Sequence, residues 1–197
     1  MKTGTLTLIV ILAIVLLFGG CACTRYNSLV TSDQSVQTAW SNVETNYQRR
    51  TDLYNSVIKT IEGSANFEKS TLTAVINARA QATSVHVDIN DSASLARYQA
   101  AQNQLQGAFS RLIAVSEAYP QLQTTKAFQD FQAQIEGTEN RINIARRDFN
   151  TTVQSYNLQV KTFPGNLFAG MFGFHVRGYF KANPGTENPP DINFNIK

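Results

Sequence analysis

Cysteine, histidine, proline and glycine are all scarce in this sequence. Its 197 residues include Cys 2, His 2, Pro 5 and Gly 11. Two cysteines cannot form a disulfide framework or a cysteine-rich zinc site, and so little glycine and proline excludes a collagen-like or low-complexity chain. The formal net charge is only +3 and no stretch carries a run of Lys or Arg, so we expect no nucleic-acid partner. Hydrophobic residues make up 43% of the chain, which predicts a single packed domain.

Recognisable catalytic and cofactor-binding motifs are also missing from the sequence. There is no glycine-rich phosphate loop, no Gly-x-Ser-x-Gly elbow, no His-Glu-x-x-His pair and no Cys-x-x-Cys pair. No glutamate has a histidine three residues later, which excludes the di-iron site of some helical bundles. His86 and His175 are far apart in the sequence, and we place them in a loop and a tail segment. We therefore predict a protein without enzymatic activity, metal or cofactor.

The amino terminus has the composition of a targeting or anchoring segment. Lys2 precedes an apolar run at residues 6–18, and the next charged residue is Arg25. One interpretation is a signal-anchor helix, since the uncharged segment is long enough to span a bilayer. The other is a lipoprotein signal, in which the small residues Gly19 and Gly20 precede a lipidated Cys21. Both interpretations treat residues 1–24 as a targeting element that tethers the rest of the chain to a membrane.

A three-four repeat predicts a long helix from about residue 32 to residue 62. Ser32 and Asp33 are good N-cap residues, and Gly63 is a good C-cap residue. The mean spacing of 3.5 residues predicts one face that packs against a partner helix throughout, as in a coiled coil. Arg50 is the charged member of this face, and we expect its guanidinium to extend from a packed stem to solvent. The face consists of Val36, Trp40, Val43, Tyr47, Arg50, Tyr54, Val57 and Ile61.

Three further helices are predicted, over about residues 67–83, 92–118 and 124–160. Residues 85–92 connect the first two of them, and Pro120 stops the 92–118 helix. The last helix is about 54 Å long, so only a partner of similar length can cover its apolar face, and the helix at 32–62 is the natural candidate. The expected fold is all-α, an antiparallel long-helix bundle resembling a four-helix bundle over residues 25–163. The inner faces carry Leu72, Val75, Ile76 and Arg79, then Leu95, Tyr98, Leu105, Phe109, Leu112, Val115 and Tyr119, then Phe128, Phe131, Ile135, Thr138, Ile142, Ala145, Phe149, Thr152, Tyr156 and Val160.

Residues 164–197 are an aromatic and glycine-rich segment followed by a polar tail that begins at Ala182. The aromatic segment is too short to span a bilayer and too apolar for a free tail. We favour a segment that folds back over one end of the bundle. The alternative is a patch that contacts a membrane surface or a partner. The candidate interaction residues are Phe168, Met171, Phe172, Phe174 and Phe180.

Several short blocks of the sequence, taken in order, carry a family resemblance. They are residues 26–30 (YNSLV), 39–44 (AWSNVE), 48–53 (QRRTDL), 78–80 (ARA), 117–120 (EAYP), 138–142 (TENRI), 145–146 (AR), 156–157 (YN) and 163–164 (FP). Together these blocks resemble the LemA family of bacterial membrane-anchored helical proteins. The resemblance implies a helical body that resembles a four-helix bundle, is attached to a membrane by its amino terminus and has no established enzymatic activity.

Charged residues within these blocks have two interpretations. They either form partly buried ion pairs that set the register of the helices, which we favour, or line a polar groove for a peptide or partner helix. The residues are Arg49, Arg50, Asp52, Glu117, Glu139, Arg141 and Arg146.

These observations predict a non-enzymatic cell-envelope scaffold or interaction protein. We expect it to be anchored in a bacterial membrane with its body on the periplasmic, extracytoplasmic side. Its expected partners are the membrane and an envelope protein of unknown identity, and self-association as a homo-oligomer stays open. The alternative is an accessory or regulatory subunit of a membrane protease or other envelope enzyme.

Overall fold

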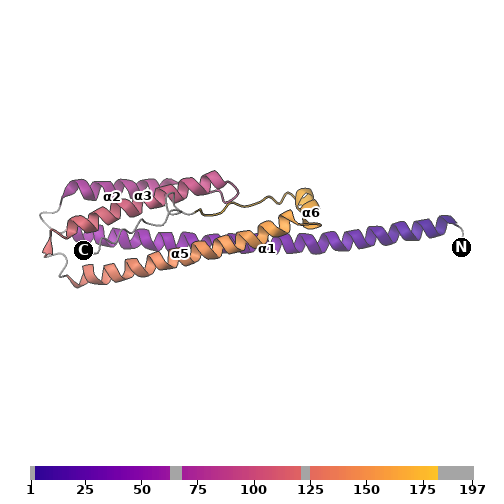
Figure 1. Ribbon diagram of the computed structural model, residues 1–197, viewed down its shortest axis with the longest axis horizontal. Helices are drawn as coiled ribbons and strands as arrows, with labels where there is room; N and C mark the ends of the chain where they lie inside the picture. The colour runs from indigo at the N-terminus through magenta and orange to yellow at the C-terminus, as the bar shows by residue number, and fades with distance from the viewer. Residues whose placement is uncertain (1–2, 63–67, 121–124, 182–197) are drawn as a thin grey trace, which may run out of the picture.

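The computed structural model describes residues 3–62, 68–120 and 125–181, and these fold into an all-α rod. The helices are α1 (Thr3–Glu62), α2 (Lys69–Ser84), α3 (Ser92–Ser116), α5 (Lys126–Lys161) and α6 (Gly165–Phe172). In Figure 1, α5 lies antiparallel to α1, while α2 and α3 lie beside this pair, and the amino-terminal end of α1 projects alone beyond α6. The predicted all-α class and antiparallel packing are confirmed. The predicted tail from Ala182 lies outside the described residues.

Helix α1 is a single helix of 60 residues, roughly 90 Å long at the standard rise. The predicted start at Ser32 and Asp33 is therefore wrong, because the apolar run at residues 6–18, which we call the stem, continues into the bundle as one helix. No proline interrupts this stretch, and its hydroxyl side chains are compatible with helix, since Thr31 and Ser35 donate to carbonyls four residues earlier. The carboxylate of Asp33 caps no helix and instead accepts hydrogen bonds from Gln37 and Arg177.

The long faces of α1 and α5 pack against each other, as their matching lengths predicted. Every member of the predicted face of α1 is buried, and on α5 only Ile135 and Thr152 are half-buried rather than buried. The described side chains form two apolar clusters along the rod. The cluster nearer the stem surrounds Trp40 and Phe149, and the farther cluster surrounds Tyr54 and Phe109.

Helices α2 and α3 form a hairpin that packs along one side of the α1–α5 pair, at the end away from the amino terminus (Figure 1). The side chain of Asp91 caps α3 by accepting from the backbone N–H groups of Ala93 at 2.8 Å and Ser94 at 3.1 Å. Leu72 and Val75 are buried as predicted, whereas Ile76 is exposed, because the buried stripe of α2 continues through Ala78 and Ala82 instead.

The chain folds back after α5, which is the arrangement that the sequence favoured. Pro164 and α6 follow the end of α5, and α6 packs against both α1 and α5. Gly173 ends α6 with a φ of 76°, a left-handed conformation that favours glycine. The chain then continues without helix or strand to residue 181, and we call residues 174–181 the strap.

Candidate functional site

A buried polar layer separates the two apolar clusters, with Arg50 at its centre. The Arg50 side chain is only 2% exposed, so the prediction that its guanidinium extends to solvent is wrong. Nη2 donates to the backbone carbonyl of Gln102 at 3.2 Å and to its side-chain oxygen, and Nη1 donates to Oε1 of Glu139 at 3.3 Å. The guanidinium therefore links α1 to α3 and α5.

Aromatic rings border this charge on both sides along α1. The Arg50 guanidinium carbon lies 4.8 Å from the centre of the Tyr47 ring and 5.9 Å from that of Tyr54. Burial raises the pKa of both phenols, and the nearby positive charge of Arg50 partly opposes this rise. Both tyrosines are consequently neutral at physiological pH and serve as packing groups.

Of the seven charged residues predicted to set register, the described structure pairs only Arg50 with Glu139. Arg146 instead donates to the carbonyl of Lys181 at 3.2 Å and lies 4.8 Å from the centre of the Phe180 ring. The remaining members, Arg49, Asp52, Glu117 and Arg141, are exposed. Among these seven residues, the described structure thus contains one ion pair between helices rather than a row of them.

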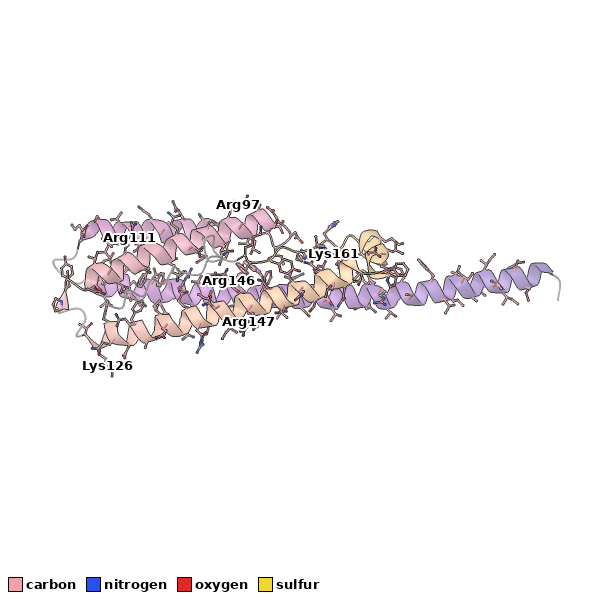
Figure 2. All side chains as sticks on the ribbon, viewed as in Figure 1. Arg97, Arg111, Lys126, Arg146, Arg147 and Lys161 are labelled. Atoms are coloured by element: carbon pink, nitrogen blue, oxygen red, sulfur yellow. The ribbon has the colours of Figure 1, made fainter. Side chains whose placement is uncertain are left out.

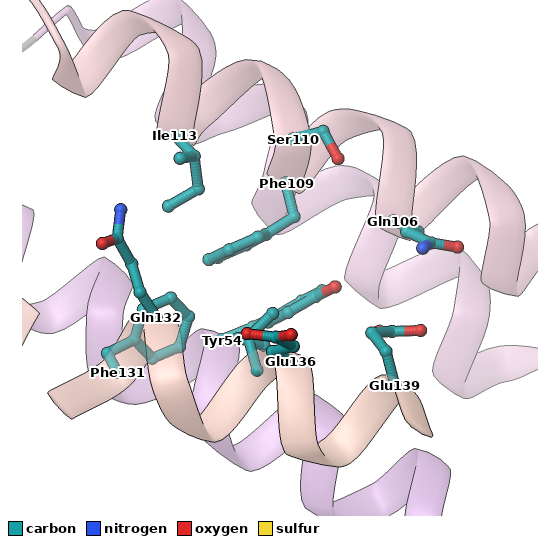
Figure 3. Close-up of a pocket in the computed structure, with 10 residues that line it drawn as sticks. Tyr54, Gln106, Phe109, Ser110, Ile113, Phe131, Gln132, Glu136 and Glu139 are labelled. Carbon is teal, nitrogen blue, oxygen red and sulfur yellow. The ribbon is translucent and has the colours of Figure 1, made fainter. Parts of the chain in front are cut away.

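A groove of about 400 Å³ lies between α3 and α5, next to the polar layer. Figure 3 shows the rings of Tyr54 and Phe109 facing each other inside it, with centres 3.7 Å apart, while Gln132 and Glu136 approach from α5. Glu139 belongs to both features, because its carboxylate accepts from Arg50 and also lines the groove. The groove is lined by Tyr54, Gln106, Phe109, Ser110, Ile113, Phe131, Gln132, Ile135, Glu136 and Glu139.

The chemistry of this groove suits recognition of an apolar and cationic surface. Aromatic and aliphatic side chains form its walls, and the carboxylate of Glu136 supplies negative charge, while that of Glu139 is already paired with Arg50. Neither histidine lines it, and His86 and His175 are both exposed. Among the described residues, no group of three or more His, Cys, Asp or Glu side chains could hold a metal ion.

The strap is held along α5 by two asparagines, Asn150 and Asn157, of which only Asn157 was named from the sequence, as part of a family block. The side-chain amide of Asn157 donates to the carbonyl of Arg177 at 3.0 Å and accepts from its N–H at 2.8 Å. Asn150 makes the same pair of bonds with Phe180, both at 2.9 Å. The two asparagines are seven positions apart on the helix, and their partners Arg177 and Phe180 are three positions apart in extended chain. Both spacings correspond to about 10 Å, so each asparagine lies beside its strap partner. The sequence feature that could have predicted this contact is the pair of asparagines seven positions apart beside the buried face of α5.

Two side chains of the strap fix its position further. Arg177 forms a largely buried ion pair with Asp33 of α1, a partnership that the sequence did not predict. The ring of Phe180 lies in the nearer cluster, with its centre 6.0 Å from that of Trp40 and 5.6 Å from that of Phe149. Gly178 passes close to α3, where an added Cβ would lie 3.0 Å from the Cα of Ser92. The strap is therefore anchored in the core through Phe180.

The five aromatic-segment residues predicted to interact divide into two groups. Phe168 and Phe180 are buried and Phe174 is half-buried, so these three pack within the protein. Met171 is 69% exposed and Phe172 is 41% exposed, and both lie on α6. Cys21 is a free, exposed thiol on α1.

Together, these features define a class of protein: an antiparallel all-α bundle with a long apolar amino-terminal helix. Within the described residues, α1 is the one helix long and apolar enough to cross a membrane. The sequence profile of the LemA family matches residues 39–194, and the chain belongs to the LemA family. This confirms the family that the sequence blocks predicted.

Similar proteins include magnetosome proteins and a protein named LemA. Magnetosome protein MamQ 2 of Paramagnetospirillum magneticum is 26% identical over 184 residues, which cover 84% of this chain and 68% of the relative. Magnetosome protein MamQ of Magnetospirillum gryphiswaldense is 24% identical with the same coverage. Protein LemA of Metamycoplasma hominis is 24% identical over 159 residues, covering 81% of this chain and 70% of the relative.

Proposed function

We propose that this protein is a membrane-anchored, non-enzymatic scaffold that binds a partner protein in the groove between α3 and α5. The observation that carries the proposal is the composition of the groove, in which aromatic walls adjoin the carboxylate of Glu136. The groove lies beside Tyr54, roughly 43 Å along α1 from Arg25. A continuous α1 holds this surface away from the apolar stem, as a scaffold requires.

The partner segment that fits this groove is an amphipathic helix with a basic edge. Helical segments commonly bind by placing apolar side chains in a hydrophobic groove between helices. The half-buried Ile113 and Ile135 offer such an apolar surface, and Glu136 favours a Lys or Arg beside it. An acidic or purely polar segment lacks this complementarity.

A photo-crosslinking experiment tests the groove in the full-length chain in native membranes. Benzoylphenylalanine replaces Gln132, which is exposed and lines the groove, and in a matched control it replaces Gln154, which is exposed elsewhere on α5. We expect discrete crosslinked products from position 132 that Glu136→Lys weakens, and none of them from position 154. Identical products from both positions, or none from position 132, would refute the groove as the binding surface.

The identity of the crosslinked products separates the two functions that the sequence left open. A mixed set of envelope proteins, or a second copy of the chain, supports a scaffold. Repeated recovery of one protease supports an accessory subunit of that enzyme, which would use the same groove. Loss of a hydrolytic activity of the purified protein on substitution of one polar residue would overturn both.

We infer that the body lies on the extracytoplasmic side of a bacterial membrane. Lys2 before the apolar run supports this orientation, because basic residues favour the cytoplasmic side. A membrane-impermeant thiol reagent applied to intact cells should label Ser155→Cys, an exposed position on α5, in a chain whose native cysteines are replaced by serine. Labelling only after lysis would place the body in the cytoplasm.

Metabolic labelling with a clickable fatty acid distinguishes the two kinds of attachment. Label that is lost in Cys21→Ser identifies a lipoprotein, whose mature chain begins at that residue. A chain without label retains α1 as a signal anchor. The bundle is the same in both cases, because the first buried residue of α1 is Leu29.

A further inference from the structure

The face of α6 that points away from the bundle is unusually apolar. The eight residues of α6 include no charged side chain, and one side of the helix is covered by the bundle through Phe168 and Ala169. Leu167 is 54% exposed and Met171 is 69% exposed, and Phe163, just before the helix, is 80% exposed. Such a cluster of large apolar side chains on a protein surface usually marks an interface.

This surface is continuous with the apolar stem of α1. The rings of Phe168 and Phe18 have centres 5.5 Å apart, and those of Phe172 and Tyr26 have centres 4.9 Å apart. Phe18 is the last residue of the apolar run, and the side chains described along this run are exposed. Figure 1 shows α6 at the point where α1 leaves the bundle. Helix α6 therefore lies beside the stem and not merely at the same end of the rod.

The length of the stem sets the depth of α6. The uncharged residues 3–24 extend about 33 Å as a helix, close to the thickness of a bilayer's hydrocarbon core. When Arg25 lies among the lipid headgroups, Phe18 lies about 10 Å deeper along the helix. Phe168 contacts Phe18, so α6 reaches the boundary between headgroups and acyl chains, the usual depth of an interfacial helix.

Basic side chains frame this apolar face, as expected at an anionic lipid surface. Lys161, at the end of α5, is exposed and lies near α6 in Figure 2, and Arg25 is exposed on α1. Positive charges beside a buried apolar face are typical of segments that bind bilayers with anionic lipids.

We propose that α6 is a second membrane contact, whose exposed face of Phe163, Leu167, Met171 and Phe172 inserts into the leaflet from which the bundle emerges. This proposal rests on the proposed insertion of α1. A single spanning helix leaves the bundle free to tilt and to rotate about its axis. The second contact fixes both motions, and it sets the direction in which the groove between α3 and α5 faces.

Depth-dependent quenching of a fluorophore on the full-length chain tests the proposal. The chain, with both native cysteines replaced by serine, is reconstituted in vesicles of phosphatidylethanolamine and phosphatidylglycerol. An environment-sensitive fluorophore is attached to Met171→Cys on α6, to Leu12→Cys in the stem, or to Ile144→Cys. Ile144 lies near the middle of α5 and is 40% exposed, so it serves as the control within the bundle. Lipids that carry a nitroxide near the headgroup or deep in the acyl chain serve as quenchers.

We expect quenching at position 171 by the shallow nitroxide to be several-fold stronger than at position 144, with position 12 quenched by the deep nitroxide. If position 12 is quenched and position 171 behaves like position 144, the stem is inserted and the second contact is refuted. Fluorophore at position 171 that is shielded from water but unquenched by lipid indicates a protein neighbour and also refutes it. If position 12 is unquenched as well, the membrane attachment in the proposed function fails too.

Discussion

The polar layer around Arg50 predicts that three substitutions will affect stability very differently. Arg50→Ala removes a long packed side chain, opens a void between the two clusters and leaves the buried side-chain oxygen of Gln102 without the donor that Arg50 supplies. Loss of packing of this kind costs about 2 to 5 kcal/mol, and an unsatisfied buried polar group adds about 1 to 3 kcal/mol. We expect this variant to lose most of the stability of the bundle.

Glu139→Ala leaves the guanidinium of Arg50 buried without its counter-charge. Because the side chain of Glu139 is 25% exposed and the pair is 3.3 Å apart, water replaces part of the interaction. We expect a loss of about 1 to 3 kcal/mol, below the 3 to 5 kcal/mol typical of a fully buried pair.

Arg50→Met fills most of the volume, so it avoids the loss of packing, but the side-chain oxygen of Gln102 still loses its donor and Glu139 its partner. We therefore expect Arg50→Met to cost about 1 to 3 kcal/mol, clearly less than Arg50→Ala, because only the penalty for the unsatisfied buried group remains. The measurement is urea unfolding of the full-length chain in detergent, followed by circular dichroism, with a double-mutant cycle on Arg50→Met and Glu139→Gln. The reasoning is refuted if Arg50→Met is as unstable as Arg50→Ala, or if Glu139→Ala has no effect.

Three further predictions concern the two clusters and the strap. Trp40→Ala should lower the free energy of unfolding by about 3 to 5 kcal/mol because the indole is only 7% exposed, whereas Trp40→Phe should cost much less, and an unchanged melt would contradict this packing. Asn157→Leu removes both bonds to Arg177, so we expect limited proteolysis to cut the strap faster than in the wild type, while equal rates would show that the asparagines do not hold it. Burial raises the pKa of Tyr54 and Tyr98 above the ordinary value of 10.0, so their contribution to stability is present below pH 10.0 and is lost as the pH rises further. Unfolding measured across this range should show a smaller pH dependence in Tyr54→Phe, and an equal dependence would contradict the assignment.

The long helices could be predicted because their signal is local and repeated. The spacing from Val36 to Ile61 identifies one face of α1, and the same spacing on α5 identifies its partner. Any helix with such an apolar face must bury it, and only two of the predicted helices were long enough to cover each other's faces. The start of α1 was misplaced because Ser32 and Asp33 suit a cap and an exposed helix position equally well, so their local preference did not decide the outcome.

The sequence by itself determined the helical class, the family, the apolar stem and the buried faces, because periodicity and composition are properties of neighbouring residues. Only the tertiary structure decided where the polar groups within those faces found partners. Arg50 bonds to Gln102, 52 positions away, and Asn157 bonds to Arg177, 20 positions away. Such pairings depend on which surfaces meet across the bundle, since a buried donor or acceptor must be satisfied by whatever group packing brings within reach.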